Sequence, residues 1–142
     1  MNNPPLVSLL VAMRNEAAYI HRCIQSLLDQ DYPPEKLEVL VLDGRSQDDS
    51  RKIVSSLIQY HPNFHLLDNP EIFQACAWNL GILHSHGEII GMVSGHCELA
   101  PDYVSQLVET LQPGMGCGSV FLSDPIFDQV ADGVHAEAIH IH

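Results

Sequence analysis

Apolar runs of strand length recur along the first part of the chain. Residues 6–12 and 37–42 are almost continuously apolar, which is typical of strands that are buried on both faces of a parallel sheet. Shorter stretches over residues 64–69 and 88–93 also contain apolar residues at strand length, and proline or glycine lies beside each. We therefore predict a strand in each of these segments.

Each predicted strand is followed by a segment with the pattern of a helix. Asn15 is placed to cap the first helix, in which apolar residues recur at helical spacing. Further helices are expected to begin near Ser46 and Pro101, and residues 71–86 predict a largely buried helix that Gly87 closes. Strand and helix alternate, which predicts an α/β fold: a mostly parallel sheet with right-handed crossovers and helices on both faces.

The pattern weakens toward the end of the chain. Residues 113–118 are rich in glycine and predict a link, and residues 119–122 have the length of one more strand. Residues 128–142 show no clear amphipathic pattern. We therefore expect one domain over residues 1–112, followed by a linker and a divergent tail over residues 113–142.

Polar segments follow three of the predicted strands, at residues 13–16, 43–49 and 94–98. The carboxyl ends of parallel strands meet at one edge of a sheet, where ligands bind, so we expect these segments to form one site. The first of them, in "AMRNEAAY", has no glycine, which excludes a dinucleotide-binding turn. A phosphate loop is excluded as well, because no glycine-rich stretch ends in Lys followed by Ser or Thr.

Charge restricts the ligands that such a site can accept. The 142 residues carry a formal net charge of −12, with 6 Lys and Arg against 18 Asp and Glu. So few cations cannot neutralise a phosphate lattice, which works against nucleic acid and anionic membranes as partners. A small anionic ligand would need positive potential from a metal ion or from helix N-termini.

The chain contains no apolar run long enough to cross a membrane, and its start, "MNNPP", lacks the basic residues of a signal peptide. We therefore expect a cytoplasmic protein. The 4 cysteines contain no closely spaced pair, which favours reduced packing thiols over disulfides or a zinc site.

Three stretches in order carry a resemblance to a known family. "VSLLVAMRNEAAYIHRCIQSLLDQDYP" is followed by "LEVLVLDGRSQDDS" and by "NPEIFQACAWNLGILHSHGEII", in which Asn79, Gly81, Gly87 and Glu88 have the family's spacing. Over roughly residues 5–112 the chain resembles a family 2 glycosyltransferase. Its Ser-Gly-His segment is most similar to bacterial exopolysaccharide transferases of the succinoglycan type, which carry Asp-Gly-His or Asp-Ala-His there.

The resemblance implies a fold, a reaction and a set of partners. The fold would be GT-A, and the donor a nucleotide diphosphate sugar held with a divalent metal, Mg²⁺ or Mn²⁺. The sugar would pass with inversion to a polysaccharide or lipid-linked acceptor, at the inner face of the membrane or in a membrane-bound biosynthetic complex.

The resemblance also implies roles for particular side chains. Asn15 and Glu16 would flank the base pocket, Asp43 would contact the nucleoside, and His96 would take the position of a metal-binding carboxylate. The full set of expected donor-binding residues is Asn15, Glu16, Asp43, Arg45, Asp48, Asn79 and Ser94.

Two departures from the family pattern qualify these roles. Ser94 replaces the first aspartate of the metal motif, so one negative charge is absent there. Family members also continue past the end of this chain into a region that supplies the general base, so the C-terminal part of the fold is expected to be missing. A remnant without catalysis, or a nucleotide-sugar-binding partner of a separate C-terminal half, is the alternative to an active transferase.

Each of these side chains also has a purely structural interpretation. Asp43 can cap the turn that follows it, and Glu16 can be a first-turn residue that the helix dipole favours. His96 can be a solvated loop histidine. His84 and His86 near a helix end point in different directions, so we do not expect them to bind a metal.

Overall fold

The computed structural model describes residues 3–111, 117–121 and 135–140. Its elements are, in chain order, β1 (Val7–Met13), α1 (Ile20–Leu28), η1 (Pro34–Lys36), β2 (Leu37–Asp43), α2 (Ser50–Ile58), β3 (Phe64–Asp68), α3 (Gln74–His84), β4 (Ile89–Ser94), α4 (Tyr103–Thr110), β5 (Cys117–Phe121) and β6 (His135–His140). No helix among these residues is both long and apolar enough to cross a bilayer.

The strands form one sheet in the order β3-β2-β1-β4-β6-β5. β1 lies between β2 and β4 and is parallel to both, and β3 is parallel to β2. β6 is antiparallel to β4, and β5 is antiparallel to β6. The predicted α/β fold with a mostly parallel sheet is therefore confirmed.

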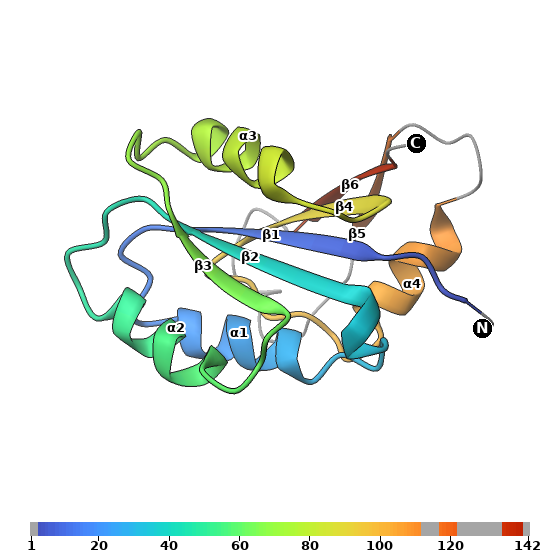
Figure 1. The fold of residues 1–142 in the computed structure, drawn as a ribbon, viewed down its shortest axis with the longest axis horizontal. Coiled ribbons are helices and arrows are strands. Elements are labelled where there is room, and N and C mark those ends of the chain that lie inside the picture. The colour runs from blue at the N-terminus through green and yellow to red at the C-terminus, as the bar shows by residue number, and fades with distance from the viewer. Residues whose placement is uncertain (1–2, 112–116, 122–134, 141–142) are drawn as a thin grey trace.

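Helices cover both faces of this sheet, as Figure 1 shows. The larger core lies between the sheet and α1, α2 and α4, and includes Ile24, Val54 and Leu107. A smaller core lies under α3, where Ala77 packs with Leu10 and other buried residues of the strands. Alternate residues of β1 enter the two cores, which explains why its sequence is apolar almost throughout.

Ser8 is the polar exception in β1. It is fully buried, and its hydroxyl donates to Glu38 Oε2 at 3.0 Å. The same hydroxyl accepts the main-chain N–H of Gly87 at 2.8 Å. Because both hydrogen bonds are made inside the fold, the buried hydroxyl is satisfied and ties β1 to β2 and to the start of β4.

The predicted role of Asn15 as a helix cap is wrong. α1 begins at Ile20, and the residue at its N-cap position is Tyr19. Asn15 has a positive φ of 52°, its N–H donates to Ser46 Oγ at 2.9 Å, and its side-chain oxygen accepts the N–H of Gln47 at 2.8 Å. The side chain therefore joins the loop after β1 to the loop after β2 instead of capping the helix.

The helix predicted over residues 71–86 is present as α3, but its predicted length and its predicted burial are wrong. α3 is shorter, and its buried residues are Ala77 and Gly81, while Leu83 is 78% exposed. These two small residues lie one helical turn apart and form the stripe that touches the sheet. A Cβ on Gly81 would lie 2.8 Å from Leu10, so glycine permits the helix to approach this closely.

The strand expected over residues 119–122 corresponds to β5, which begins slightly earlier, at Cys117. β6 lies in the segment for which the sequence shows no clear pattern. Its sequence, HAEAIH, holds a single β-branched residue, so its strand propensity is weak. The strand is identified by its antiparallel pairing with β4 and β5.

Candidate functional site

The three polar segments identified in the sequence do meet at one edge of the sheet. The register pairs Met13 with Asp43 and Ala12 with Ser94, so β1, β2 and β4 end at the same level. The strand order places β1 between β2 and β4. The chain runs from β1 to β2 and β3 on one side of β1, and the connection through α3 then brings it to β4 on the other side. A crevice outside such a switch point is where open α/β sheets bind ligands.

The loops that follow β1 and β2 are joined by hydrogen bonds. The N–H of Glu16 donates to the buried hydroxyl of Ser50 at 2.8 Å, and the N–H of Ala17 donates to Asp48 Oδ2 at 3.1 Å. The other carboxylate oxygen of Asp48 accepts the N–H of Ser50 at 3.0 Å and its hydroxyl at 2.5 Å. Asp48 therefore holds the start of α2 against the β1 loop.

These bonds make the loop junction sensitive to acid. The Ser50 hydroxyl, with the N–H groups of Ser50 and Ala17, holds the pKa of Asp48 below its ordinary value. The resulting stabilisation is present above that ordinary value and is lost as the pH falls through the lowered one. We expect Asp48→Asn to lower the urea midpoint at about pH 7, and the difference from the parent chain to shrink at about pH 3.

Asp49→Asn is the matched control for this measurement, because Asp49 is the neighbouring N-cap residue and makes no side-chain cap hydrogen bond. A difference between Asp48→Asn and the parent chain that is the same at both pH values would show that the carboxylate does not carry the effect.

Asp43 at the end of β2 is the buried member of a polar cluster whose other side chains are partly or largely exposed. Its carboxylate accepts the hydroxyl of Ser46 at 2.5 Å and Arg51 Nη1 at 2.9 Å. Arg51 also donates to the exposed Asp68 at 2.6 Å. The hydrogen bond to Asp43 is the main cause of a raised pKa of Arg51.

A cavity of about 160 Å³ opens beside these loops at the ends of β1 and β4. Its floor is apolar, with Ala12, Leu42 and Ala77, and its polar residues include Arg14 and Glu16. The complete lining is Ala12, Met13, Arg14, Glu16, Leu42, Asn69, Ile72, Gln74, Ala77, Ser94 and His96. Such a lining suits a ligand that has an apolar portion and several polar groups.

One wall of the cavity contains a strained residue. Ile72 has a φ of 71°, which is rare for a β-branched side chain. Asn69 fixes the loop: its N–H donates to the carbonyl of Asp43 at 2.8 Å, and its amide donates to the carbonyl of Phe73 at 3.0 Å. Gly44 accommodates this wall, since a Cβ there would lie 2.9 Å from the carbonyl oxygen of Ile72.

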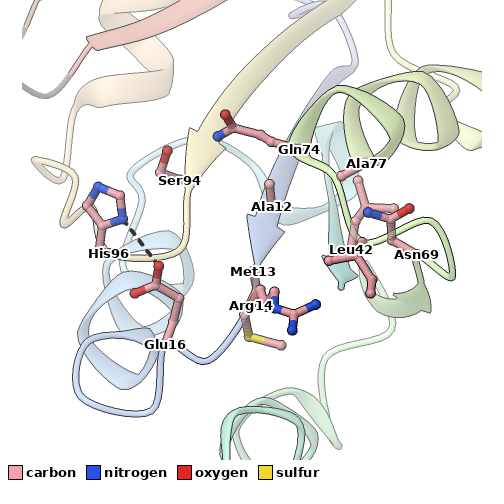
Figure 2. A pocket seen from close by; sticks show the side chains of 11 residues that line it. Ala12, Met13, Arg14, Glu16, Leu42, Asn69, Gln74, Ala77, Ser94 and His96 are labelled. Atoms are coloured by element: carbon pink, nitrogen blue, oxygen red, sulfur yellow. Dashed lines mark hydrogen bonds and ion pairs between the residues drawn. The ribbon is translucent and has the colours of Figure 1, made fainter. Parts of the chain in front are cut away.

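The β4 end contributes Ser94 and His96 to the cavity. His96 Nδ1 lies 3.4 Å from Glu16 Oε1, and the two side chains face each other in Figure 2. Cys97, between this loop and the core, is buried, and burial raises the pKa of its thiol. Cys97 therefore remains a thiol and is a poor metal ligand at neutral pH.

The structure divides the predicted site residues into two groups. Glu16, Ser94 and His96 line the cavity, whereas Asn15, Asp43 and Asp48 hold the loops around it. Arg45 is exposed with a φ of 55°, and Asn79 is exposed on α3; neither lines the cavity.

Sequence reasoning missed several residues of the lining. Arg14 stands in a segment that the sequence marks as polar, so its position gave a signal. Asn69, Ile72 and Gln74 come from the loop after β3 and from α3, where the sequence predicts a helix that begins earlier.

An open, mostly parallel sheet with helices on both faces and a polar cavity at its switch point defines an α/β ligand-binding domain of the GT-A-like type. Comparison with known proteins specifies the class further. Residues 8–133 match the family model described as glycosyl transferase family 2. The chain therefore belongs to this family, which confirms the resemblance of its sequence to family 2 glycosyltransferases.

Curated relatives in two archaea are similar to this chain. One is the dolichyl N-acetyl-alpha-D-glucosaminyl phosphate 3-beta-D-2,3-diacetamido-2,3-dideoxy-beta-D-glucuronosyltransferase of Methanococcus voltae, 30% identical over 108 residues, or 75% of this chain and 34% of the relative. Another is glycosyltransferase AglE of Haloferax volcanii, 32% identical over 75% of this chain and 36% of the relative. The chain thus spans about a third of the length of these relatives.

A solved structure extends the likeness to the fold. The mannosyltransferase PcManGT from Pyrobaculum calidifontis, in complex with GDP-Man and Mn²⁺, superposes with a TM-score of 0.80 at 26% sequence identity. The superposition covers 98% of this chain and 45% of the mannosyltransferase chain.

Proposed function

We propose that this chain binds a nucleotide diphosphate sugar in the cavity at the ends of β1 and β4, as the donor-binding part of an inverting glycosyltransferase. The observation that carries the proposal is the position of this polar cavity at the switch point of a family 2 domain. The complex of the similar mannosyltransferase with GDP-Man supports the choice of donor class.

Arg14 places a positive charge in the lining of the cavity, which supports an anionic ligand there. The chain as a whole has a formal charge of −12, but the fixed charges of the lining residues are those of Arg14 and Glu16 and cancel. Arg14 Nη1 donates to the carbonyl of Gly44 at 3.1 Å, which holds the guanidinium at the cavity. We propose that Arg14 binds a phosphate oxygen of the donor, for which guanidinium geometry is well suited.

A divalent ion, Mg²⁺ or Mn²⁺, is proposed as the cofactor, with His96 as one ligand. When bound, such an ion would offset the charge of the diphosphate and favour its departure. The lining offers a carboxylate, an imidazole and a hydroxyl, which are donors that these ions accept. Among the described residues no group of three His, Cys, Asp or Glu side chains is arranged around a metal, so donor oxygens and water would complete the coordination.

The proposed transfer is a direct displacement at the anomeric carbon. The acceptor hydroxyl oxygen would form the new bond to this carbon while the bond to the nucleotide diphosphate breaks, and a general base would take the hydroxyl proton. The relative from Methanococcus voltae carries a dolichyl phosphate sugar in its name, which supports a lipid-linked acceptor. Action at the inner face of the membrane is proposed with it. An exopolysaccharide acceptor of the succinoglycan type is supported by the Gly-His pair at residues 95 and 96.

A second candidate function is nucleotide-sugar binding without transfer, in partnership with a separate polypeptide that supplies the acceptor site and base. Ser94 favours it, because a hydroxyl stands where the family pattern described above has the first aspartate of its metal motif. Transfer to a lipid-linked or polysaccharide acceptor by the purified chain alone would contradict this second candidate.

Calorimetric titration with GDP and UDP, with and without Mn²⁺, tests the donor site. We expect one of the two nucleotides to bind, and Arg14→Ala to weaken its binding by at least about tenfold, since a hydrogen bond to a charged group is worth about 1.5–3 kcal/mol. Arg22→Ala is the matched control, because Arg22 is exposed on α1 and does not line this cavity. Equal losses in both variants, or no binding of either nucleotide by the folded chain, would contradict the proposal.

A further inference from the structure

Glu16 lies where it can replace the carboxylate that Ser94 does not supply. We propose that Glu16 and His96 together are the protein ligands of the divalent ion, one from the end of β1 and one from the end of β4. This inference rests on the proposed function for the identity of the third partner, the diphosphate of the donor. It gives Glu16 a different role from the base contact that the sequence predicts.

The distance between the two side chains fits a shared ion. Glu16 Oε1 and His96 Nδ1 are 3.4 Å apart, which is longer than the usual 2.7–3.2 Å of a hydrogen bond. Two neighbouring ligands of an octahedral ion, each at about 2.1 Å and at right angles, lie about 3.0 Å apart. A shift of a few tenths of an ångström would therefore let both atoms coordinate one ion.

The surrounding structure holds Glu16 in this position. Its main-chain N–H is tied to the buried Ser50 hydroxyl at 2.8 Å. Its Cγ lies 3.3 Å from the point where a Cβ on Gly95 would stand, so the stem of the side chain packs against the turn between Ser94 and His96.

Both side chains remain accessible to an ion and a ligand. The Glu16 side chain is 23% exposed and the His96 side chain 51% exposed, and both line the cavity with Ser94. Two protein ligands leave coordination positions open for phosphate oxygens and water, which is how Mg²⁺ is usually held beside a phosphate substrate. A carboxylate with an imidazole also suits Mn²⁺.

Titration with Mn²⁺ alone tests the pair without any nucleotide. The paramagnetic ion broadens amide signals near its site in proton–nitrogen spectra of the isotope-labelled chain. We expect the amides of residues 14–17 and 94–97 to broaden first. Glu16→Gln and His96→Gln should each raise the Mn²⁺ concentration at which these amide signals broaden by about tenfold or more. The dispersion of signals in the metal-free spectrum of each variant shows whether the variant is folded.

Glu35→Gln is the matched control, because Glu35 is exposed in η1, which precedes β2 and so lies away from the carboxyl ends of the strands. The amide signals of this control variant should broaden at the same Mn²⁺ concentrations as those of the parent chain. Broadening confined to other residues, or unchanged broadening at residues 94–97 in Glu16→Gln, would overturn the inference and leave an adventitious ion only.

A parallel titration with GDP and UDP separates this inference from the proposed function. Nucleotide binding that is the same with and without Mn²⁺, and is unchanged by Glu16→Gln, would overturn the metal pair and leave the donor site standing. Broadening by Mn²⁺ at Glu16 and His96 without binding of either nucleotide would support the metal pair and contradict the donor site.

Discussion

Replacing Asp43 by alanine is expected to lower the free energy of unfolding by about 2–3 kcal/mol, because a buried, charged acceptor is lost. The side chain of Asp43 is 0% exposed and accepts hydrogen bonds from Ser46 and Arg51. Its removal leaves the Ser46 hydroxyl without its acceptor beneath the loop that borders the cavity. Urea unfolding followed by circular dichroism measures the change.

Asp68→Ala is a close control, because the same arginine binds both carboxylates. Asp68 is 76% exposed, and an exposed ion pair contributes about 0–1 kcal/mol. We therefore expect Asp68→Ala to unfold close to the parent chain. An equal loss in the two variants would mean that Arg51, rather than burial of the Asp43 carboxylate, determines the stability of this cluster.

Alanine in place of Gly87 should destabilise the chain by about 2–3 kcal/mol, near the upper end of what overpacking costs. A Cβ there would lie 2.6 Å from the main-chain nitrogen and from the hydroxyl oxygen of Ser8, and 2.8 Å from the carbonyl oxygen of Ile89. The backbone must shift to relieve these contacts, which weakens the pairing of β1 with β4. Urea unfolding again provides the measurement.

Gly95→Ala is the matched control for this steric effect. A Cβ on Gly95 would approach its nearest neighbours, Ala12, Glu16 and Ile20, at 3.2–3.3 Å. Neighbours at this distance need to move by only a few tenths of an ångström, so we expect a loss below about 1 kcal/mol. A Gly87→Ala variant as stable as the parent would show that the close contact with Ser8 does not require glycine.

Strands were predicted well because burial on both faces leaves a simple signal in the sequence. The apolar runs at residues 6–12 and 37–42 lie within one residue of β1 and β2. Alternation of strand and helix then determines a parallel sheet, because a short loop cannot return a chain in the parallel direction. The common edge of the three polar segments follows from that topology.

Helix boundaries were predicted less well, because their signals are short-range and tertiary contacts compete with them. Asn15 has the chemistry of a cap, but its nearest partners are Ser46 and Gln47, more than thirty residues away. Gly87 has the chemistry of a helix stop, but α3 ends before it and Gly87 is needed for close contact with Ser8. In both cases the residue type correctly marked a special position in the chain, but the sequence did not show which contact the residue makes there.

The sequence by itself determined the α/β class, the order of the strands along the chain and the membership of Glu16, Ser94 and His96 in one edge of the sheet. These properties depend on the spacing of apolar residues within each element and on the rules for connecting neighbouring elements, and both can be read from short stretches of sequence. Only the tertiary structure decided that the buried carboxylate of Asp43 binds Ser46 and Arg51. The structure also decided that strained Ile72 forms a wall of the cavity and that Glu16 faces His96 across eighty residues of chain. Such placements depend on how loops pack against one another, because side-chain partners distant in sequence are selected by the free energy of the whole fold.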